Sequence, residues 1–255
     1  TLGTGVTISD IRIAPVIAHS IATINVLAPG RVVLGLGAGH TAWRAMGMKP
    51  VPIKSFRHTI EVCRSMLRGE SALFRARGHE GQVRFMDTDS GYINIKDPIA
   101  VYVAASHPRA QGLAGELGDG LLTLSLLDAN VLEHNLQPVR RALALRTVTP
   151  PDNFDVVTIG ISCVLAPGEA LNSARVLARV GPRIAVALHY AYEQLRQGME
   201  VPPFLAAFLT PEYQQYLEQR WDVVHATHSR FLHDGEARFI TPDAIGAMSL
   251  TGTSD

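Results

Sequence analysis

The sequence has few cysteines, no excess of charge and no long apolar run, and each absence excludes a class of protein. Cys63 and Cys163 lie far apart in apolar contexts, which argues against a disulfide framework and favours a reducing, cytoplasmic setting. The 23 basic residues equal the 23 acidic ones, so no basic face for nucleic acid or an anionic membrane is expected. No apolar run reaches the ~18 residues that a membrane span needs. We therefore expect neither a nucleic-acid nor a membrane partner.

What the chain does have is enough length and apolar content for a sizeable core. It contains 255 residues, of which 47% are hydrophobic, and this suits one α/β barrel or two small domains. Strand-like and helix-like runs alternate, which predicts a parallel sheet with crossover helices. The strand-like runs are residues 2–7, 32–36, 99–104, 120–124 and 156–165, and the helix-like runs are residues 14–27, 55–67, 108–117, 130–144 and 167–197.

Two segments interrupt this alternation. Residues 70–98 are polar and glycine-containing, which predicts an insertion that carries a hairpin. Residues 201–241 open with Pro202-Pro203 and continue as a helix rich in Tyr, Trp and His. In barrels, long insertions at the carboxyl ends of the strands tend to build the pocket. No repeat or linker divides the chain, so we expect one domain over residues 1–255.

Both ends of the sequence are expected to be incomplete. Residues 1–7 have the pattern of a strand that is already in progress, and residues 250–255 have the pattern of a helix N-cap with no helix after it. A fragment, or a chain without its terminal elements, is the interpretation that these patterns favour.

The strand at residues 31–40 carries the strongest signal for function. It is a short apolar run that ends in Gly35, Gly37 and Gly39, followed by His40. Glycine at the carboxyl end of a buried strand indicates a close approach, either of a ligand or of packed backbone. A third interpretation is the dinucleotide fingerprint G-x-G-x-x-A at residues 37–42. Its acidic partner is expected ~20 residues further on, at the end of the next strand, whereas Glu61 falls inside a predicted helix.

Two further segments resemble ligand-binding backbone. Residues 99–106 run from a strand into Ser106, which is predicted to cap a helix that has Pro108 in its first turn. The amides and positive end of that helix could bind phosphate with help from Arg109, although an ordinary helix cap is the commoner explanation of an isolated pattern of this kind. Residues 3–7, with two glycines in a short strand, indicate a bulge or another close approach.

Few polar residues are candidates for catalysis or metal binding. His40 stands at the carboxyl end of its strand, where a proton-transfer group would belong, although a solvated loop histidine is an equal alternative. His225 and His228 have no third ligand nearby, so no metal site is predicted. His189 is interpreted as a packing residue, and Asp119 as a turn former between two glycines.

Six short motifs in a fixed order resemble the bacterial luciferase-like superfamily of flavin- and deazaflavin-dependent oxidoreductases and monooxygenases. The motifs are residues 2–7, 29–39, 67–70, 98–106, 113–120 and 250–253. The branch that the chain is most similar to is the methylenetetrahydromethanopterin-reductase-like group, whose members often use coenzyme F420. The resemblance implies a (β/α)8 TIM barrel of the luciferase-like type. This barrel would be incomplete here, with strands three to seven present and the terminal strands missing.

The same resemblance implies where a flavin or deazaflavin would bind. Gly5 and Val6 would form a non-proline cis peptide whose bulge supports the back of the ring. Gly39 and His40 would lie beside the ring, although many relatives have an acid at the position of His40.

The cofactor phosphate has its own implied site. Ser106, with the amides of His107 and Arg109, would hold it.

The activity implied by the resemblance is hydride transfer between a bound F420 or FMN and a small organic substrate. His40 would then donate or accept the accompanying proton, and a homodimer is expected. The alternatives are an FMN-dependent monooxygenase that uses dioxygen and a catalytically silent flavin-binding protein. A doubly wound nicotinamide-binding sheet is a further alternative, based on the match at residues 37–42.

Overall fold

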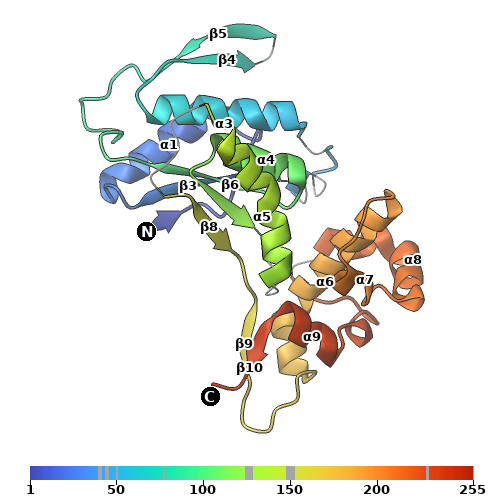
Figure 1. The fold of residues 1–255 in the computed structure, drawn as a ribbon. Helices are drawn as coiled ribbons and strands as arrows, with labels where there is room; N and C mark the ends of the chain where they lie inside the picture. Colours follow the sequence, from blue (N-terminus) through green and yellow to red (C-terminus); the bar gives the residue numbers. More distant parts are fainter. Residues whose placement is uncertain are drawn as a thin grey trace. The chain divides into compact units, whose positions relative to one another are not determined.

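The computed structural model describes residues 1–39, 42–43, 46–49, 51–76, 78–123, 129–147, 153–227 and 230–254 (Figure 1). The chain divides into two compact units, which are described separately. The sheet unit comprises Thr1–Leu124 and Glu133–Thr158, and the helical unit comprises Ser125–Leu132 and Ile159–Asp255. Among the described residues, no helix has both the length and the apolar character needed to cross a membrane.

The sheet unit is built on a parallel sheet whose strand order follows the chain. Its strands are β1 (Leu2–Gly3), β2 (Thr7–Ile8), β3 (Val32–Gly37), β6 (Ala100–Ala104), β7 (Gly120–Thr123) and β8 (Asp155–Thr158). Strands β1 and β2 both pair with β3, and β6, β7 and β8 follow in parallel pairs. The crossover helices are α1 (Ala14–Leu27), α3 (Ile53–Leu67), α4 (Pro108–Leu117) and α5 (Ala129–Ala144).

This arrangement confirms the predicted alternation and matches an incomplete (β/α)8 barrel. It also contradicts the doubly wound alternative, because that topology requires a point at which the strand order reverses. The described strands of the sheet instead follow one another in sequence order.

The two faces of the sheet differ in composition because successive side chains of a strand alternate between them. One face is apolar and packs against the helices, through buried Leu34 and Leu36 of β3 and Val101 and Val103 of β6. Burial of each such side chain stabilises the fold by about 1.5–3 kcal/mol. The other face of β3 carries only glycine at positions 35 and 37. Strand β3 therefore has one conventional core face and one face that is bare at these two positions.

The insertion at residues 70–98 contains an antiparallel hairpin of β4 (Ala72–Ala76) and β5 (His79–Val83). The predicted hairpin is thereby confirmed. The other predicted insertion, residues 201–241, is not one helix. It contains α7 (Pro203–Ala206), α8 (Pro211–Thr227) and a 3-10 turn, η1 (Ala237–Phe239).

The helical unit also contains a small parallel sheet that corrects two predictions. The predicted strand at residues 156–165 is two strands in different sheets, β8 and β9 (Ser162–Val164). The predicted helix cap at the end of the chain is β10 (Leu250–Gly252), which follows α9 (Pro242–Met248). Backbone bonds from Leu250 N to Ile161 O and from Leu165 N to Gly252 O join β10 to β9. This pairing determines that residues 250–252 form a strand, and the partner strand β9 lies far away in the sequence.

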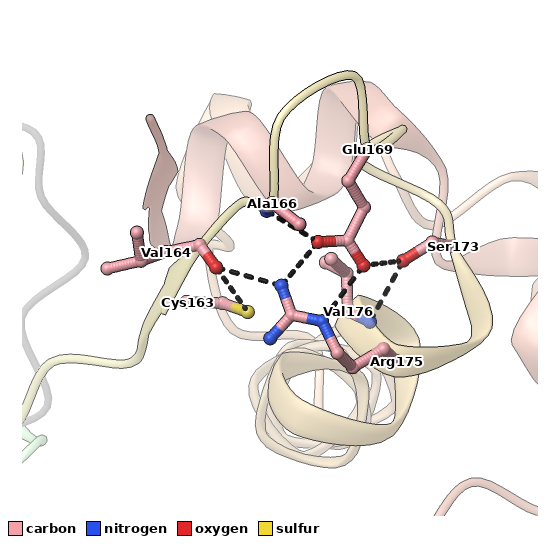
Figure 2. Close-up of polar contacts among 7 residues, drawn as sticks. All are labelled: Cys163, Val164, Ala166, Glu169, Ser173, Arg175 and Val176. Carbon is pink, nitrogen blue, oxygen red and sulfur yellow. Dashed lines mark hydrogen bonds and ion pairs between the residues drawn. The ribbon is translucent and has the colours of Figure 1, made fainter. Parts of the chain in front are cut away.

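Helix α6 (Ala174–Arg196) begins later than the predicted start at residue 167. The Ser173 hydroxyl accepts a hydrogen bond from Val176 N at 3.2 Å and so caps the first turn. Glu169 in turn accepts a hydrogen bond from the Ser173 hydroxyl at 2.7 Å (Figure 2). Side chains that bond nearby backbone and hydroxyl groups compete with helix formation, which explains the delayed start.

The Glu169 carboxylate organises the loop before α6. It accepts hydrogen bonds from Arg175 and from Ala166 N, and Arg175 also donates to Val164 O at 2.8 Å (Figure 2). The hydrogen bond from Arg175, followed by those from the Ala166 amide and the Ser173 hydroxyl, lowers the pKa of Glu169 to about 2. The carboxylate therefore stays ionised and the loop stays bonded over the whole physiological pH range.

A buried polar network lies inside the helical unit. His189 Nε2 lies 2.5 Å from Glu236 Oε1, and the Tyr213 hydroxyl donates to the same oxygen at 2.9 Å. All three residues are buried. Burial alone would raise the pKa of Glu236, but the bonds from His189 and Tyr213 outweigh it and lower the pKa. His189 is thus a packing residue, as predicted, but one that stabilises a buried carboxylate.

We expect this network to make the helical unit sensitive to acid. Because the folded-state pKa of Glu236 is depressed, its contribution is present above the unfolded pKa of about 4.3 and is lost as pH falls through the folded value. Glu236→Gln should lower the free energy of unfolding at pH 7 by about 1–3 kcal/mol and flatten its dependence on pH between about 5 and 3. Urea unfolding at several pH values measures both effects.

The control is Glu212→Gln, because Glu212 pairs with Arg238 on the surface with both side chains largely exposed. This change should alter stability by less than about 1 kcal/mol. An unchanged pH dependence in Glu236→Gln would contradict the assignment.

Candidate functional site

The parallel strands of the sheet unit end at one common edge, where α/β proteins of this topology bind ligands. Three neighbouring strands contribute the predicted site residues at this edge. Gly5 and Val6 lie between β1 and β2, Gly39 follows β3, and Ser106 follows β6. Gly37 of β3 pairs with Ala104 of β6, so Gly39 and Ser106 each stand two residues beyond that pair.

The first strand of the sheet, which β1 and β2 form together, carries a bulge between them. Gly3 pairs with Val33 and Thr7 pairs with Leu36, so residues 4–6 stand opposite residues 34–35 of β3. This is one residue more than its partner strand has, which is the definition of a β-bulge. The Gly5–Val6 peptide bond within it is cis, as the resemblance implies. The predicted bulge is therefore confirmed.

The glycines of β3 make room for this bulged strand. They share the bare face of the sheet, and a Cβ atom at any of them would collide with the neighbouring segment. The nearest atom would be the Thr4 carbonyl oxygen at 2.0 Å for Gly35, Val6 Cγ2 at 2.7 Å for Gly37 and Ile8 Cγ2 at 2.2 Å for Gly39. Of the interpretations of this strand, close packing against the neighbouring segment accounts for all three glycines. A ligand would meet the bulge rather than Gly35 and Gly37 beneath it.

Among the residues that the structure describes, the space beside Gly5 is open. A Cβ atom at Gly5 would meet no described atom within 4 Å. The outward side of the Gly5–Val6 peptide is thus a backbone surface that a flat group could approach.

The N-terminus of α4 provides a second backbone surface. The N-cap residue is His107, with Pro108 at the first helical position, so the prediction that Ser106 is the cap is wrong. Proline prefers the first helical position, and the cap therefore falls on the residue directly before it. The first turn contains no acidic residue, and the N-cap side chain makes no cap hydrogen bond among the described residues. Its amides, including that of Arg109, keep the positive end of the helix available to an anion.

Below the edge, Tyr102 of β6 supports the bare face of the sheet. Its ring lies against Gly120 of β7, where a Cβ atom would come within 2.8 Å of Tyr102 Cδ1. The Tyr102 hydroxyl donates to the Asp155 carboxylate of β8. Burial, with this hydrogen bond, raises the pKa of Tyr102 to about 12, so the phenol stays neutral at physiological pH. This pair links β6 to β8 across β7, beneath the site.

Asp10 is a residue at this edge that the sequence analysis missed. It follows β2 with a φ of 65°, a conformation that Asp tolerates better than most residues. Its carboxylate accepts hydrogen bonds from Thr59 Oγ1 at 3.0 Å and from the Ser55 hydroxyl, both on α3. Asp directly after a strand was the available signal. The side chain fixes the loop after β2 to the neighbouring helix.

Some predicted site residues are not placed. His40, the predicted catalytic residue, and His228 lie outside the described residues, and the side chain of His225 is not described either. Trp43, after His40, is buried and donates its backbone amide to Gly39 O at 3.0 Å. Within the described part of the chain, no cluster of His, Cys, Asp and Glu has the composition of a metal site.

Together these observations define a class of protein. It is a parallel α/β protein of the barrel type, with a backbone bulge and a helix N-terminus at the carboxyl edge of its sheet. A family model described as luciferase-like monooxygenase matches residues 1–255. The chain therefore belongs to the luciferase-like monooxygenase family.

Individual relatives place the chain within this family. It is 27% identical over 267 residues to 5,10-methylenetetrahydromethanopterin reductase of Archaeoglobus fulgidus, a match that covers all of this chain and 70% of the relative. It is 32% identical over 149 residues to F420-dependent glucose-6-phosphate dehydrogenase of Nakamurella multipartita, covering 55% of this chain and 42% of the relative. The corresponding enzyme of Intrasporangium calvum is 31% identical, and the match covers 54% of its length. The chain thus spans about half the length of these dehydrogenases.

A solved structure shows the same fold. The coenzyme F420-dependent tetrahydromethanopterin reductase of Methanopyrus kandleri aligns with a TM-score of 0.64 and 18% identity, over 98% of this chain and 69% of that one. At this level of identity the likeness concerns the fold alone.

Proposed function

We propose that this chain forms the cofactor-binding part of an oxidoreductase that exchanges a hydride between bound F420 or FMN and a small organic substrate. The observation that carries the proposal is the Gly5–Val6 bulge, seated on the glycines of β3 with open space on its outer side. The names of the relatives favour F420 over FMN as the cofactor. A bound F420 or FMN supplies the hydride-transfer chemistry, and the protein supplies binding and orientation.

The residues present fit such a group at two points. The bulge offers flat backbone without a side chain at Gly5, which suits one face of a planar ring. The first turn of α4 offers backbone amides at the positive end of a helix, beside Ser106 and Arg109, which suits a phosphate. We assign the ring to Gly5, Val6 and Gly39, and the phosphate to Ser106 and the amides of His107 and Arg109.

His40 is the proposed proton donor or acceptor. It follows Gly39 at the edge where the ring would lie, and an imidazole exchanges protons near neutral pH. Its role is to handle the proton that accompanies hydride transfer to or from an organic carbonyl or alcohol group.

The direct test is titration of the full-length protein with F420 and, separately, with FMN, followed by absorbance and fluorescence. We expect saturable binding of F420, and binding of neither cofactor would overturn the proposal. Consumption of dioxygen by the FMN-loaded protein with a reductant would instead favour the monooxygenase alternative. Binding without any turnover would favour the silent flavin-binding alternative.

Arg109→Gln should weaken FMN or F420 binding about tenfold, because it removes a positive charge beside the phosphate site. Binding of riboflavin, or of the dephosphorylated deazaflavin core of F420, should change less than twofold. Comparing the dissociation constants of phosphorylated and phosphate-free ligands isolates the phosphate contribution.

The control is Arg31→Gln, which removes the same charge from an exposed position before β3, at the opposite edge of the sheet. It should leave all four dissociation constants unchanged. Equal weakening of phosphorylated and phosphate-free ligands by Arg109→Gln would refute the phosphate assignment.

A further inference from the structure

The Thr4 side chain takes the place of backbone in the sheet. Its hydroxyl donates to Gly35 O at 2.8 Å and accepts from Gly35 N at 3.0 Å. In a regular parallel ladder, both groups of Gly35 would bond the backbone of the neighbouring strand. At the bulge, one side-chain hydroxyl bonds both of these groups.

The bond lies at the gap between two regular pairings. On one side Thr4 N donates to Val33 O at 3.3 Å, and on the other Ser9 N donates to Gly37 O at 2.9 Å. Between these points, the buried Gly35 bonds the side chain of Thr4. Without the hydroxyl, the buried N–H of Gly35 would lose this partner, which is unfavourable for a folded protein.

The same residue places the peptide that follows it. The Thr4 carbonyl oxygen lies directly over Gly35, only 2.0 Å from where a Cβ would be. The hydroxyl and the carbonyl therefore fix Thr4 against one residue of β3 at two points. Because Gly5 comes next in the chain, this attachment sets where the open side of the Gly5–Val6 peptide lies.

We propose that Thr4 is a positioning residue whose hydroxyl holds the bulge at the height and angle that the cofactor ring requires. The inference rests on the proposed function, since it gives Thr4 a role in the same site. It goes further because it assigns the geometry of that site to one side-chain hydroxyl outside the predicted contacts. Thr4 acts through Gly5 and Val6 and is not itself required to touch the ring.

The experiment compares Thr4→Val with Thr4→Ser in the full-length protein. Valine keeps the shape of threonine and removes both hydrogen bonds, whereas serine keeps the hydroxyl and removes the methyl group. The matched control is Thr23→Val on α1, which removes a hydroxyl bonded to His19 O at 3.0 Å on an exposed helix surface. Cofactor dissociation constants, the absorption spectrum of the bound cofactor and the melting temperature are measured for each.

We expect Thr4→Val to raise the cofactor dissociation constant at least tenfold and to shift the spectrum of the bound cofactor. Thr4→Ser should restore both to within about threefold of wild type, and Thr23→Val should change neither. A purely structural role would lower the melting temperature of Thr4→Val while leaving the affinity and spectrum of the folded fraction unchanged. That result would overturn the inference, as would equal weakening by the valine and serine variants.

A substitute variant and the binding of the wild-type protein keep the test decisive. If Thr4→Val does not fold, Thr4→Ala replaces it, because the smaller side chain leaves room for water to bond Gly35. If the wild-type protein binds neither F420 nor FMN, the proposed function fails and the role of Thr4 fails with it. If the wild type binds and Thr4→Val binds equally well, only the role of Thr4 is overturned.

Discussion

Replacing Asp119 by asparagine should lower the free energy of unfolding by about 3–5 kcal/mol, because it leaves two buried guanidinium groups without a counter-charge. Asp119 Oδ1 lies 2.8 Å from Arg64 Nη1 and 3.8 Å from Arg146 Nη2. The exposed fractions of these arginine side chains are only 7% and 1%. Asparagine still offers an oxygen to the Val101 amide, which Oδ2 accepts at 2.9 Å, so the change isolates the charge.

The remaining contacts of the arginines explain why one carboxylate suffices. Arg64 donates to Leu117 O, and Arg146 donates to Gly118 O at 2.6 Å and to Gly115 O at 3.3 Å. These carbonyls belong to the last turn of α4 and the residue after it, the negative end of the helix. Burial lowers the pKa of both arginines, the direction expected for cations held away from water. Without Asp119, the hydrogen bonds described for the two guanidinium groups would all go to carbonyl oxygens.

The measurement is chemical unfolding of Asp119→Asn beside Asp89→Asn. Asp89 pairs with Lys96 at the surface, with side chains 87% and 80% exposed, and its change should cost less than about 0.5 kcal/mol. Arg64→Met should cost clearly less than Asp119→Asn, because it leaves one arginine facing one carboxylate. The double variant should be more stable than the sum of the single changes predicts, by at least about 1 kcal/mol. Additive effects would contradict the charge argument.

The case of Asp119 illustrates what local patterns in the sequence can and cannot predict. Its position between two glycines predicted a turn, and it does lie between α4 and β7. Its two arginine partners come from α3 and from the segment beyond α5, and nothing in the local sequence indicates that they converge. Charge pairs formed across the fold depend on the topology, which local patterns do not specify.

The helices with strong local signals were predicted most accurately. The bounds of α1 and α4 agree with the prediction, because proline lies at each start and a glycine-containing turn follows each end. Helix α6 begins seven residues later than predicted, because the side chain of Glu169 stabilises the preceding loop. Strand β10 was missed because its partner β9 lies some ninety residues earlier. Local signals in the sequence therefore predicted the bounds of these helices, whereas the long-range pairing of strands could not be predicted from them.

The candidate site followed the same division. The motifs located the bulge at residues 3–7, the glycine strand and the start of α4 on three neighbouring strands. They did not reveal that each glycine of β3 accommodates an atom of the bulged strand, because this requires the register between two strands. The role of the glycine strand is therefore to support the segment that would contact the ligand.

Gly35→Ala should consequently disrupt the site more severely than any other small substitution in it. The new Cβ would lie 2.0 Å from the Thr4 carbonyl oxygen and 2.8 Å from Leu122 Cδ1. The leucine methyl can rotate away, but the carbonyl can move only if the backbone of the bulge moves. We expect a loss of about 3 kcal/mol in the free energy of unfolding, at the upper end for overpacking, and a loss of cofactor binding of at least a hundredfold. Urea unfolding and cofactor titration of the same preparation measure the two effects.

Two comparisons separate a backbone clash from a general intolerance of added volume. Gly3→Ala places its Cβ 3.4 Å from Val33 O, an ordinary contact, and should bind the cofactor as wild type does. Gly37→Ala meets a side-chain methyl, Val6 Cγ2, at 2.7 Å, so adding Val6→Ala should recover much of its lost stability. No change of the Thr4 side chain can recover Gly35→Ala in this way, because the obstacle is a main-chain oxygen. Wild-type affinity in Gly35→Ala would mean that the bulge is not seated on β3 as described, and the proposed site would lose its foundation.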